Sequence, residues 1–479
     1  MDTKKLRQKI LDLAIRGKLV PQDPNDEPAS VLLERIRAEK EQLIKEGKIK
    51  RSKKSAATDK SHYENVPFEI PESWCWTTLG ELCSIKGGKR LPKGKSFADT
   101  ITPHIYIRVT DMKDHTVLLS SLKYIDEDVF AEIKNYTISS NDLYLTIAGT
   151  IGDVGLVPAE LDGANLTENA AKLTDIKCSK QYLMYVLMSS IAQDHFCSRF
   201  HQVAQPKLSL ETASSTLIPL PPYREQLRIA EELDRWLGVV VSVEDDLSEL
   251  TNYVRKTKSK ILDLAISGKL VPQDLDNEPA IELLKRINPG FEPCDNSHYG
   301  NLPFEVPDGW CWATLGSIGK WQSGATPSRM RKDYYGGDIP WLKTGDLNDW
   351  YITDIPEYIT QQALNETSVK LNPAGSILIA MYGATIGKIG ILTMPATTNQ
   401  ACCACISHNG IEQMYLFYYL LSHKEEFVRQ GGGGAQPNIS KEKIVETLIP
   451  IPPLSEQLRI IKAIEAIFNQ IDTITAELS

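Results

Sequence analysis

The sequence lacks any apolar run close to the roughly 20 residues that a membrane-spanning helix needs. Its opening residues, MDTKKLRQKI, lack the apolar stretch of a signal peptide. The 9 cysteines among 479 residues follow no regular spacing, so a disulfide framework is not expected. We therefore predict a cytoplasmic protein, and a chain of this length predicts roughly two to four domains rather than one core.

The motifs of catalytic and metal-binding sites are also absent. The 8 histidines form no HExxH pair, and CCAC (Cys402–Cys405) has no second Cys/His pair at zinc spacing. GKRLPKGKS (Gly88–Ser96) has one residue too many for a phosphate-binding loop, and YGATIGKIG (Tyr382–Gly390) predicts a tight turn between strands. LPPY (Leu220–Tyr223) approaches an amino-methyltransferase signature, but its leucine cannot accept a hydrogen bond from a target amine. We predict no catalytic residue, no metal site, no cofactor bound by this chain, buried thiols in CCAC and a proline-capped helix start at LPPY.

A basic composition is missing as well. The chain has 53 Lys and Arg against 62 Asp and Glu, for a net charge of −9. This balance excludes a wholly basic coat for nucleic acid, but it leaves room for local basic patches. The segment KIKRSKKSAATDK (Lys48–Lys60) is typical of a solvated linker, and a non-specific phosphate clamp is the alternative interpretation.

What the sequence does contain is a pair of long repeats. ILDLAI-x-GKLVPQD occurs at Ile10–Asp23 and again at Ile261–Asp274. REQLRI (Arg224–Ile229) returns as SEQLRI (Ser455–Ile460). The order of these motifs is that of a tandem duplication cut at a different point, so one repeat unit is split between the two ends of the chain.

The stretches between these motifs predict two copies of one α+β domain. FEIPESWCW near the start of the first copy matches FEVPDGWCW in the second, and AQPKLSLETASSTLIPLPP matches AQPNISKEKIVETLIPIPP near their ends. The sequence thus predicts five regions, which are a helical segment and basic linker (1–60), a first domain (61–222), a central helical spacer (223–297), a second domain (298–453) and a C-terminal helix that pairs with the central helix (454–479).

The central spacer carries a heptad pattern, which is typical of a coiled coil. Its predicted core positions are Leu233, Val240, Leu247, Val254 and Ile261, with a companion series at Trp236, Val243, Leu250, Thr257 and Leu264. The C-terminal helix supplies Ile464, Ile471 and Leu478. We expect two helices that pair antiparallel and bury both seams.

Basic residues recur at one place in both copies. The first copy has KGGKRLPKGK, the second has SGATPSRMRK, and a later strand adds Arg108 in one and Lys343 in the other. Glycine-containing basic loops can approach a phosphate backbone, and arginine can also bind guanine edges. The predicted DNA-contacting residues are Lys86, Lys89, Arg90, Lys93, Lys95, Arg108, Gln205 and Lys207 in the first copy, and Arg329, Arg331, Lys332, Lys343, Gln436 and Asn438 in the second.

These motifs and their circular order resemble the DNA-specificity subunit of type I restriction–modification enzymes over essentially the whole chain. The resemblance implies two target-recognition domains separated by an antiparallel pair of helices, each domain reading one half of a split site in double-stranded DNA. It also implies a subunit without catalysis of its own. Its partners would be two modification subunits, which methylate adenine N6 with S-adenosylmethionine, and two restriction subunits, which use ATP and Mg²⁺.

Two other interpretations stay open at this stage. One is a self-contained adenine methyltransferase or nuclease with unrecognised motifs, and the other is a coiled-coil protein adaptor. The helical spacer favours the resemblance, because a helix from Leu233 to Leu264 would be roughly 47 Å long. Half-sites one turn of DNA apart are separated by about 34–36 Å, so a helix of this length can place two domains on successive major grooves.

Overall fold

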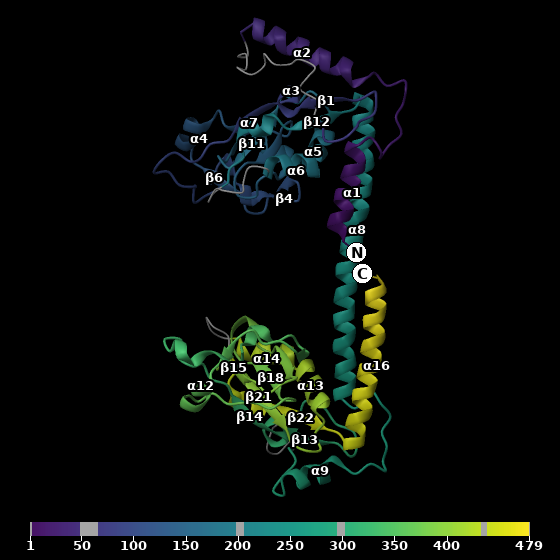
Figure 1. Ribbon diagram of the computed structural model, residues 1–479, viewed down its shortest axis with the longest axis vertical. Coiled ribbons are helices and arrows are strands. Elements are labelled where there is room, and N and C mark those ends of the chain that lie inside the picture. The colour runs from purple at the N-terminus through teal and green to yellow at the C-terminus, as the bar shows by residue number, and fades with distance from the viewer. Residues whose placement is uncertain (1, 48–65, 198–205, 295–301, 433–437, 479) are drawn as a thin grey trace. The chain divides into compact units, whose positions relative to one another are not determined.

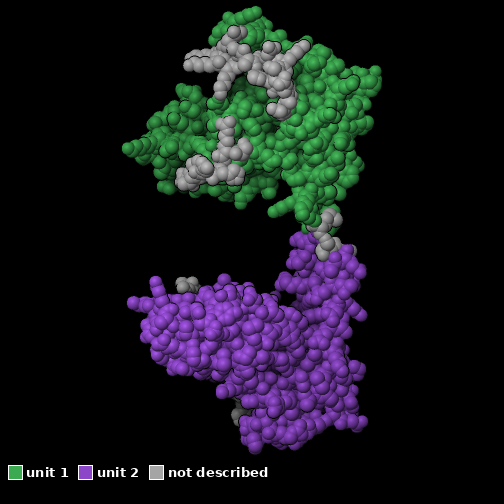
Figure 2. All heavy atoms as spheres, viewed as in Figure 1, with its two compact units in different colours: residues 1–246 green, residues 247–479 purple. Residues whose placement is uncertain are grey.

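The computed structural model describes residues 2–47, 66–197, 206–294, 302–432 and 438–478. Figure 1 traces the chain, and Figure 2 colours its two compact units, Met1–Asp246 and Leu247–Ser479. One helix, α8 (Tyr223–Ile266), begins in the first unit and ends in the second. Each unit consists of an α+β domain and a pair of helices that pack against it.

The first unit opens with α1 (Thr3–Ile15) and α2 (Ala29–Lys45). The strands of its domain are β1 (Cys75–Thr78), β2 (Ser84–Gly87), β3 (His104–Ile107), β4 (Met112–Lys113), β5 (Thr116–Val117), β6 (Lys123–Ile125), β7 (Thr137–Ile138), β8 (Leu143–Thr146), β9 (Val154–Leu156), β10 (Ala164–Leu166), β11 (Ala170–Thr174) and β12 (Leu217–Leu220). The helices between them are α3 (Leu79–Leu82), α4 (Glu127–Ile133), α5 (Lys180–Met188), α6 (Ser190–Cys197) and α7 (Leu210–Ser214).

Two four-stranded sheets form the body of this domain, in the orders β6-β3-β10-β7 and β2-β11-β8-β9. All four residues of β8, which lies between β11 and β9, are buried, as is typical of a central strand with a short, mostly apolar sequence. Helix α5 buries six consecutive residues, from Tyr182 to Leu187, so it lies inside the unit rather than on its surface. Each fully buried aliphatic side chain in this core contributes roughly 1.5–3 kcal/mol.

The second unit repeats this plan. Its strands are β13 (Cys311–Thr314), β14 (Gly319–Ser323), β15 (Tyr335–Leu342), β16 (Tyr351–Ile352), β17 (Tyr358–Ile359), β18 (Ile377–Ala380), β19 (Ile389–Leu392), β20 (Thr397–Thr398), β21 (Cys402–Ser407) and β22 (Leu448–Ile451). Its helices are α9 (Ala280–Ile287), α11 (Leu315–Ile318), α12 (Gln361–Glu366), α13 (Gln413–Ser422), α14 (Lys424–Gly431), α15 (Lys441–Glu446) and α16 (Leu454–Leu478).

Strand order confirms that the two domains are copies of one fold. The sheets β14-β21-β18-β19-β16 and β17-β15-β20 follow the order of β2-β11-β8-β9 and β6-β3-β10 in the first copy. The pair β13-β22 matches β1-β12, with Trp312 opposite Pro450 as Trp76 is opposite Pro219. The predicted details also hold. The three cysteines of CCAC are buried on β21, the segment before β19 is a turn, and α8 begins directly after Pro222.

In the first unit, α1 lies antiparallel to α8. Arg7 forms an ion pair with Glu244 at 2.6 Å, whereas Asp26, farther along the chain, pairs at 2.7 Å with Arg228, which lies earlier in α8. The apolar faces of both helices join the core around α5, where Ile10 and Leu233 are buried. The helices therefore pack on the domain as well as on each other.

The second unit pairs the last part of α8 with α16 in the same way. Lys258 contacts Asp472 at 2.5 Å, and Gln273, beyond the end of α8, donates to Glu456 at 2.9 Å near the start of α16. Ile261 and Ile464 are buried here with the aromatic side chains of α13. The antiparallel direction predicted from the repeats is confirmed in each unit.

The predicted heptad holds better in its first series than in its companion series, in which Val243, Leu250 and Leu264 are half-buried and the other two positions are exposed. Leu233, Val240 and Ile261 are buried, Leu247, Val254 and Ile471 are half-buried, and the side chain of Leu478 lies outside the described part of the structure. In the companion series, Trp236 is 41% exposed and Thr257 is exposed. One residue later than the companion series, Glu244 and Lys258 form ion pairs with α1 and α16, and Leu237 and Ala265 join the two cores, because α1 and α16 approach that side of α8.

A joint between the domain and its helices explains the GKLVPQD repeat. Gly17 has a φ of +66°, and a Cβ on it would lie 2.5 Å from Pro71 Cγ. Gly268 is the same, with a φ of +69° and Pro307 Cγ at 2.4 Å. Only glycine adopts this conformation cheaply and leaves room for the proline ring.

The EQLRI repeat supplies the other side of this joint. Glu225 is buried and accepts hydrogen bonds from Gln22 Nε2 at 3.1 Å and from the indole of Trp74 at 3.1 Å. The next residue, Gln226, accepts from the Ser179 amide and donates to the Pro221 carbonyl, both at 2.8 Å. Burial raises the pKa of Glu225, and the same cause raises the pKa of Glu456 in the second copy.

Candidate nucleic-acid interface

In the first domain, the basic loop 88–95 is fixed to the end of β10. The Gly88 amide donates to the Ala170 carbonyl at 2.9 Å, and the Lys89 amide donates to the Leu166 carbonyl at 2.8 Å. A Cβ on Gly88 would lie 2.1 Å from the Thr167 carbonyl oxygen, so the close approach requires glycine. A side chain of β3 also supports the loop, because the Tyr106 hydroxyl donates to the Lys89 carbonyl at 2.7 Å.

The second domain holds its loop 324–332 with the same bonds. The Gly324 amide donates to the Cys402 carbonyl at 2.9 Å, and the Ala325 amide donates to the Thr398 carbonyl at 3.0 Å. The indole of Trp341, at the place of Tyr106, donates to the Ala325 carbonyl at 3.0 Å. The two loops thus have one backbone frame, although their sequences differ.

A third segment, which follows the AQP motif, completes the surface in each copy. Lys207 forms a β-bridge with Ala148, just after β8, and Asn438 forms the equivalent bridge with Tyr382, just after β18. In the first copy, Lys207 Nζ also approaches the Glu168 carbonyl at 3.4 Å. We call residues 88–95, 148–150, 167–169 and 207 the first loop surface, and residues 324–332, 382–384, 399–401 and 438 the second.

The cations of the first loop surface differ in how strongly they are held. Lys93 is exposed, as is Lys86 on β2 just before this surface, and the ammonium group of the exposed Lys89 lies 5.5 Å from the centre of the Tyr136 ring. Arg90 lies 3.8 Å from Glu168 and keeps 77% of its side chain exposed. Lys95 is paired with Asp128 at 2.5 Å, and this carboxylate raises the pKa of the lysine.

Arg108 and Lys343 occupy equivalent places, as predicted, but both have partners within the chain. The Arg108 side chain binds the buried carboxylate of Asp111 at 2.5 Å and donates to the Ser121 carbonyl at 2.8 Å. Lys343 forms an ion pair with Glu357, and its amide donates to Asp346 at 2.8 Å, as the Arg108 amide does to Asp111. Their first contribution is therefore to fix the backbone beneath the surface.

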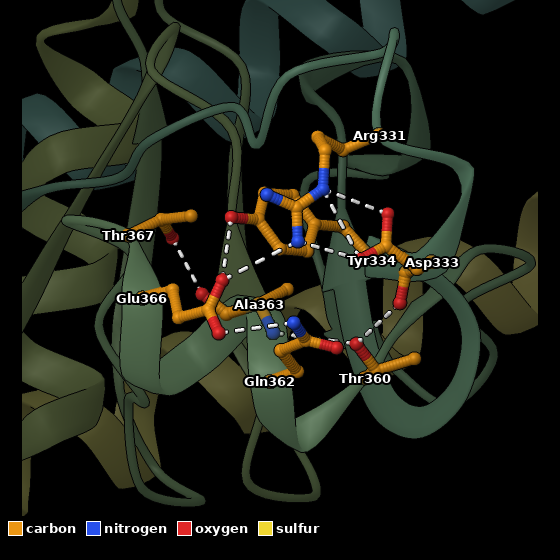
Figure 3. Close-up of polar contacts among 8 residues, drawn as sticks. All are labelled: Arg331, Asp333, Tyr334, Thr360, Gln362, Ala363, Glu366 and Thr367. Atoms are coloured by element: carbon orange, nitrogen blue, oxygen red, sulfur yellow. Dashed lines mark hydrogen bonds and ion pairs between the residues drawn. The ribbon is translucent and has the colours of Figure 1, made fainter.

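In the second domain, two arginines brace the loop. Arg329 stacks on Tyr335 and Trp341, at 4.5 and 5.0 Å from the ring centres, and donates to Glu357 at 2.9 Å. Arg331 lies between Asp333 and Glu366, at 2.6 and 3.4 Å (Figure 3). With two carboxylates around one guanidinium, the Arg331 cluster has no spare positive charge.

Figure 3 also shows how that cluster ties the loop to α12. The Tyr334 hydroxyl donates to Glu366 at 2.9 Å, and the Thr360 hydroxyl donates to the Asp333 carbonyl at 2.9 Å. Lys332, between these anchored residues, is exposed, and so is Asn438. Gln205, Gln436 and the basic segment 48–60 lie outside the described residues.

Sequence reasoning missed the residues that build and flank the loops. These are the supporting aromatic residues Tyr106 and Trp341, and the turn residues Glu168 and Gln400. Strand pairing rather than a local motif makes Glu168 and Gln400 equivalent, so the sequence alone does not reveal them.

Two further findings on the described residues concern metals and membranes. No group of three or more His, Cys, Asp or Glu side chains there is placed to hold a metal ion. Among the helices of the same residues, none is long and apolar enough to cross a membrane.

Comparison with known proteins matches both copies separately. Residues 71–248 and 307–479 each match the family described as type I restriction modification DNA specificity domain. The chain is 28% identical to the type I restriction enzyme EcoEI specificity subunit of Escherichia coli, over 99% of this chain and 90% of that protein. It is 27% identical to the EcoAI specificity subunit of the same species, over 97% of this chain and 89% of the relative.

A solved structure shares the fold. A chain from a study of complex assembly and conformational transition of the type I R-M system aligns with a TM-score of 0.58, covering 86% of this chain and 94% of that one at 19% identity. With two family matches on two copies of one fold, the chain belongs to the type I restriction-modification DNA specificity family and carries that family's domain twice.

Proposed function

We propose that this chain is the non-catalytic specificity subunit of a type I restriction-modification complex, and that each of its domains reads one half of a bipartite site in double-stranded DNA. The observation that carries this proposal is the pair of loop surfaces. The same backbone bonds hold both loops, while the side chains that they present differ. One scaffold with two sets of side chains is what two different half-sites require.

The phosphate contacts fall to the exposed cations. Lys86, Lys89 and Lys93 in the first copy and Lys332 in the second are exposed, so little internal bonding has to break before they contact a phosphate. The other predicted cations remain candidates, but binding DNA through Arg108, Arg331 or Lys343 would first cost an ion pair within the chain. The net charge of −9 opposes the approach of DNA to the chain as a whole. In this proposal, partner subunits therefore make part of the phosphate contacts.

The partners in this proposal are two modification subunits and two restriction subunits, on which S-adenosylmethionine, ATP and Mg²⁺ are bound. Docking of the modification subunits is assigned to the helices. Leu227 and Leu458, at the same place in the EQLRI repeat, are 47% and 43% exposed, although their neighbours on both sides are buried or half-buried. Helix α2, where Val31 is 37% exposed, is a second candidate.

Charge removal in the full complex tests the DNA surface. The double variant Lys89→Ala/Lys93→Ala should bind all duplex sequences more weakly and to the same degree. The slope of log K against log of the salt concentration should fall in magnitude by about one to two. Lys113→Ala, an exposed lysine on β4 outside the loop surface, is the matched control. Unchanged affinity and salt slope in the double variant would remove this surface from the proposal.

The docking assignment is tested by counting subunits. Leu227→Lys or Leu458→Lys should each cost the complex one modification subunit, because each places a charge in an apolar contact. Native mass spectrometry reads the stoichiometry directly. Retention of both modification subunits by both variants would contradict the assignment.

A further inference from the structure

One residue of each loop surface is at an equivalent place and has an unexpected chemistry. Glu168 follows β10 in the first copy, and Gln400 follows β20 in the second. Their equivalence rests on the strand pairing, because Leu166 pairs with Ile107 as Thr398 pairs with Leu342. Both residues are two positions beyond these pairs.

Each of the two contacts the same point of its loop. Arg90 Nε lies 3.8 Å from Glu168 Oε1, and Thr326, the counterpart of Arg90, donates a hydrogen bond to Gln400 Oε1. Both copies keep this contact, but the groups differ. The first copy pairs a cation, Arg90, with an acid, Glu168, and the second pairs a hydroxyl, Thr326, with an amide, Gln400. Glu168 is 33% exposed and Gln400 is exposed, so both can meet a ligand above the surface.

An acid among phosphate-binding cations needs an explanation. Glu168 lies with Arg90 beside it and with Lys207 Nζ on its own carbonyl, and a carboxylate repels a phosphate. A carboxylate does bind the exocyclic amine of a base, and glutamate pairs with cytosine N4 in the major groove, whereas glutamine pairs with adenine N6 and N7. The two side chains thus differ in the base that each accepts.

We propose that Glu168 and Gln400 are specificity-determining residues of the two half-sites, with Glu168 accepting from a cytosine amine and Gln400 binding adenine. This inference rests on the proposed function. In it, Arg90 and Thr326 position the reading side chains, and the shared bonds of Gly88 and Gly324 set the distance from backbone to base. A matched reading pair discriminates against the wrong base by roughly 5- to 150-fold.

The test is selection from a randomised duplex DNA library by the full chain assembled with its modification subunits, followed by sequencing. The wild type defines the split motif. Glu168→Gln should then change one position of one half-site from cytosine to adenine, and Gln400→Glu should change one position of the other half-site from adenine to cytosine. Lys93→Ala is the control, and it should weaken all sequences alike, because Lys93 is an exposed cation of the same loop and does not position the reading group.

The outcomes are distinct. If the wild type selects a split motif and both exchanges leave every base preference unchanged, the inference is overturned and the proposed function stands. If Arg90→Ala changes a base preference that Glu168→Gln leaves unchanged, reading belongs to the arginine and the inference is overturned for the first copy. If the wild type selects no split motif, the proposed function fails and the inference fails with it. Since both exchanges are isosteric and at least partly exposed, loss of folding is not expected, and hydrogen exchange of β10 and β20 checks it.

Discussion

The joint glycines offer the sharpest test of how domain and helices are held together. Gly17→Ala forces a left-handed conformation on a residue with a Cβ, at a cost of about 1–2 kcal/mol. It also places that Cβ 2.5 Å from Pro71 Cγ and 3.2 Å from the Trp74 ring, and overpacking of this kind costs about 1–3 kcal/mol. The first unit should therefore lose roughly 2–5 kcal/mol of stability.

Matched variants separate the two contributions. Gly163 has a φ of +84°, and a Cβ on it would have no neighbour within 4 Å, so Gly163→Ala should show only the conformational cost of about 1–2 kcal/mol. Gly238 lies within helix α8 with open space around it, and Gly238→Ala should stabilise by about 0.5–1 kcal/mol.

Hydrogen exchange measured by mass spectrometry gives the opening free energy of each unit in the intact chain. Gly17→Ala should reduce protection in α1, α5 and the first part of α8 and leave α13 and α16 unchanged, whereas Gly268→Ala should do the reverse. Equal losses for Gly17→Ala and Gly163→Ala would refute the packing account of the joint.

Three further predictions concern the buried glutamines of the EQLRI repeat, the His115–Asp153 pair and helix α8. Gln226→Leu leaves the buried Ser179 amide and Pro221 carbonyl without their hydrogen-bond partner, and Gln457→Leu does the same to the Glu412 amide and the Pro452 carbonyl. Each substitution should lower the stability of its own unit by about 2–6 kcal/mol. Losses below about 1 kcal/mol, measured by hydrogen exchange, would contradict these roles. The Asp153 carboxylate raises the pKa of His115 above its ordinary value of 6.5. The pair therefore stabilises the first unit below pH 6.5, and this stabilisation is lost as the pH rises through the raised pKa. In Asp153→Asn, NMR titration should show a lower pKa for His115, and an unchanged pKa would refute the pairing. Four residues inserted in α8 near Ser248 should lengthen the helix by about 6 Å, which is on the order of two base pairs. Selection of DNA by the assembled complex should then return two unchanged half-sites with a wider gap between them. Altered half-site bases would contradict the role of α8 as a spacer.

The sequence predicts much of the fold because its repeats are long and share one order. The matched pairs Gly17 and Gly268, Trp74 and Trp310, and Glu225 and Glu456 all lie at the joints, where backbone clashes and buried polar bonds leave few alternatives. The helix register is predicted less well. Heptad counting places Trp236 inward, but α1 approaches α8 one position later, and the position of a partner helix is not encoded in the spacing of one helix.

The loop surfaces lie beyond what sequence patterns reveal. Lys89 and Leu166 are brought together by the order β6-β3-β10-β7, which no local motif specifies. Charge alone also misleads there, because Arg331 and Lys343 look like free cations in the sequence, yet their charges are neutralised by Asp333, Glu366 and Glu357. The reading turn at Glu168 is defined by strand pairing that the two copies share, and pairing between distant strands leaves no local signature in either sequence.

In the proposed function, each domain reads one half-site independently of the other. The most direct measurement exchanges residues 61–222 for the matching domain of another family member and determines the DNA motif selected by the assembled complex. We expect one half-site to change while the other half-site and the gap between them stay the same. A change in both half-sites, or in neither, would contradict it.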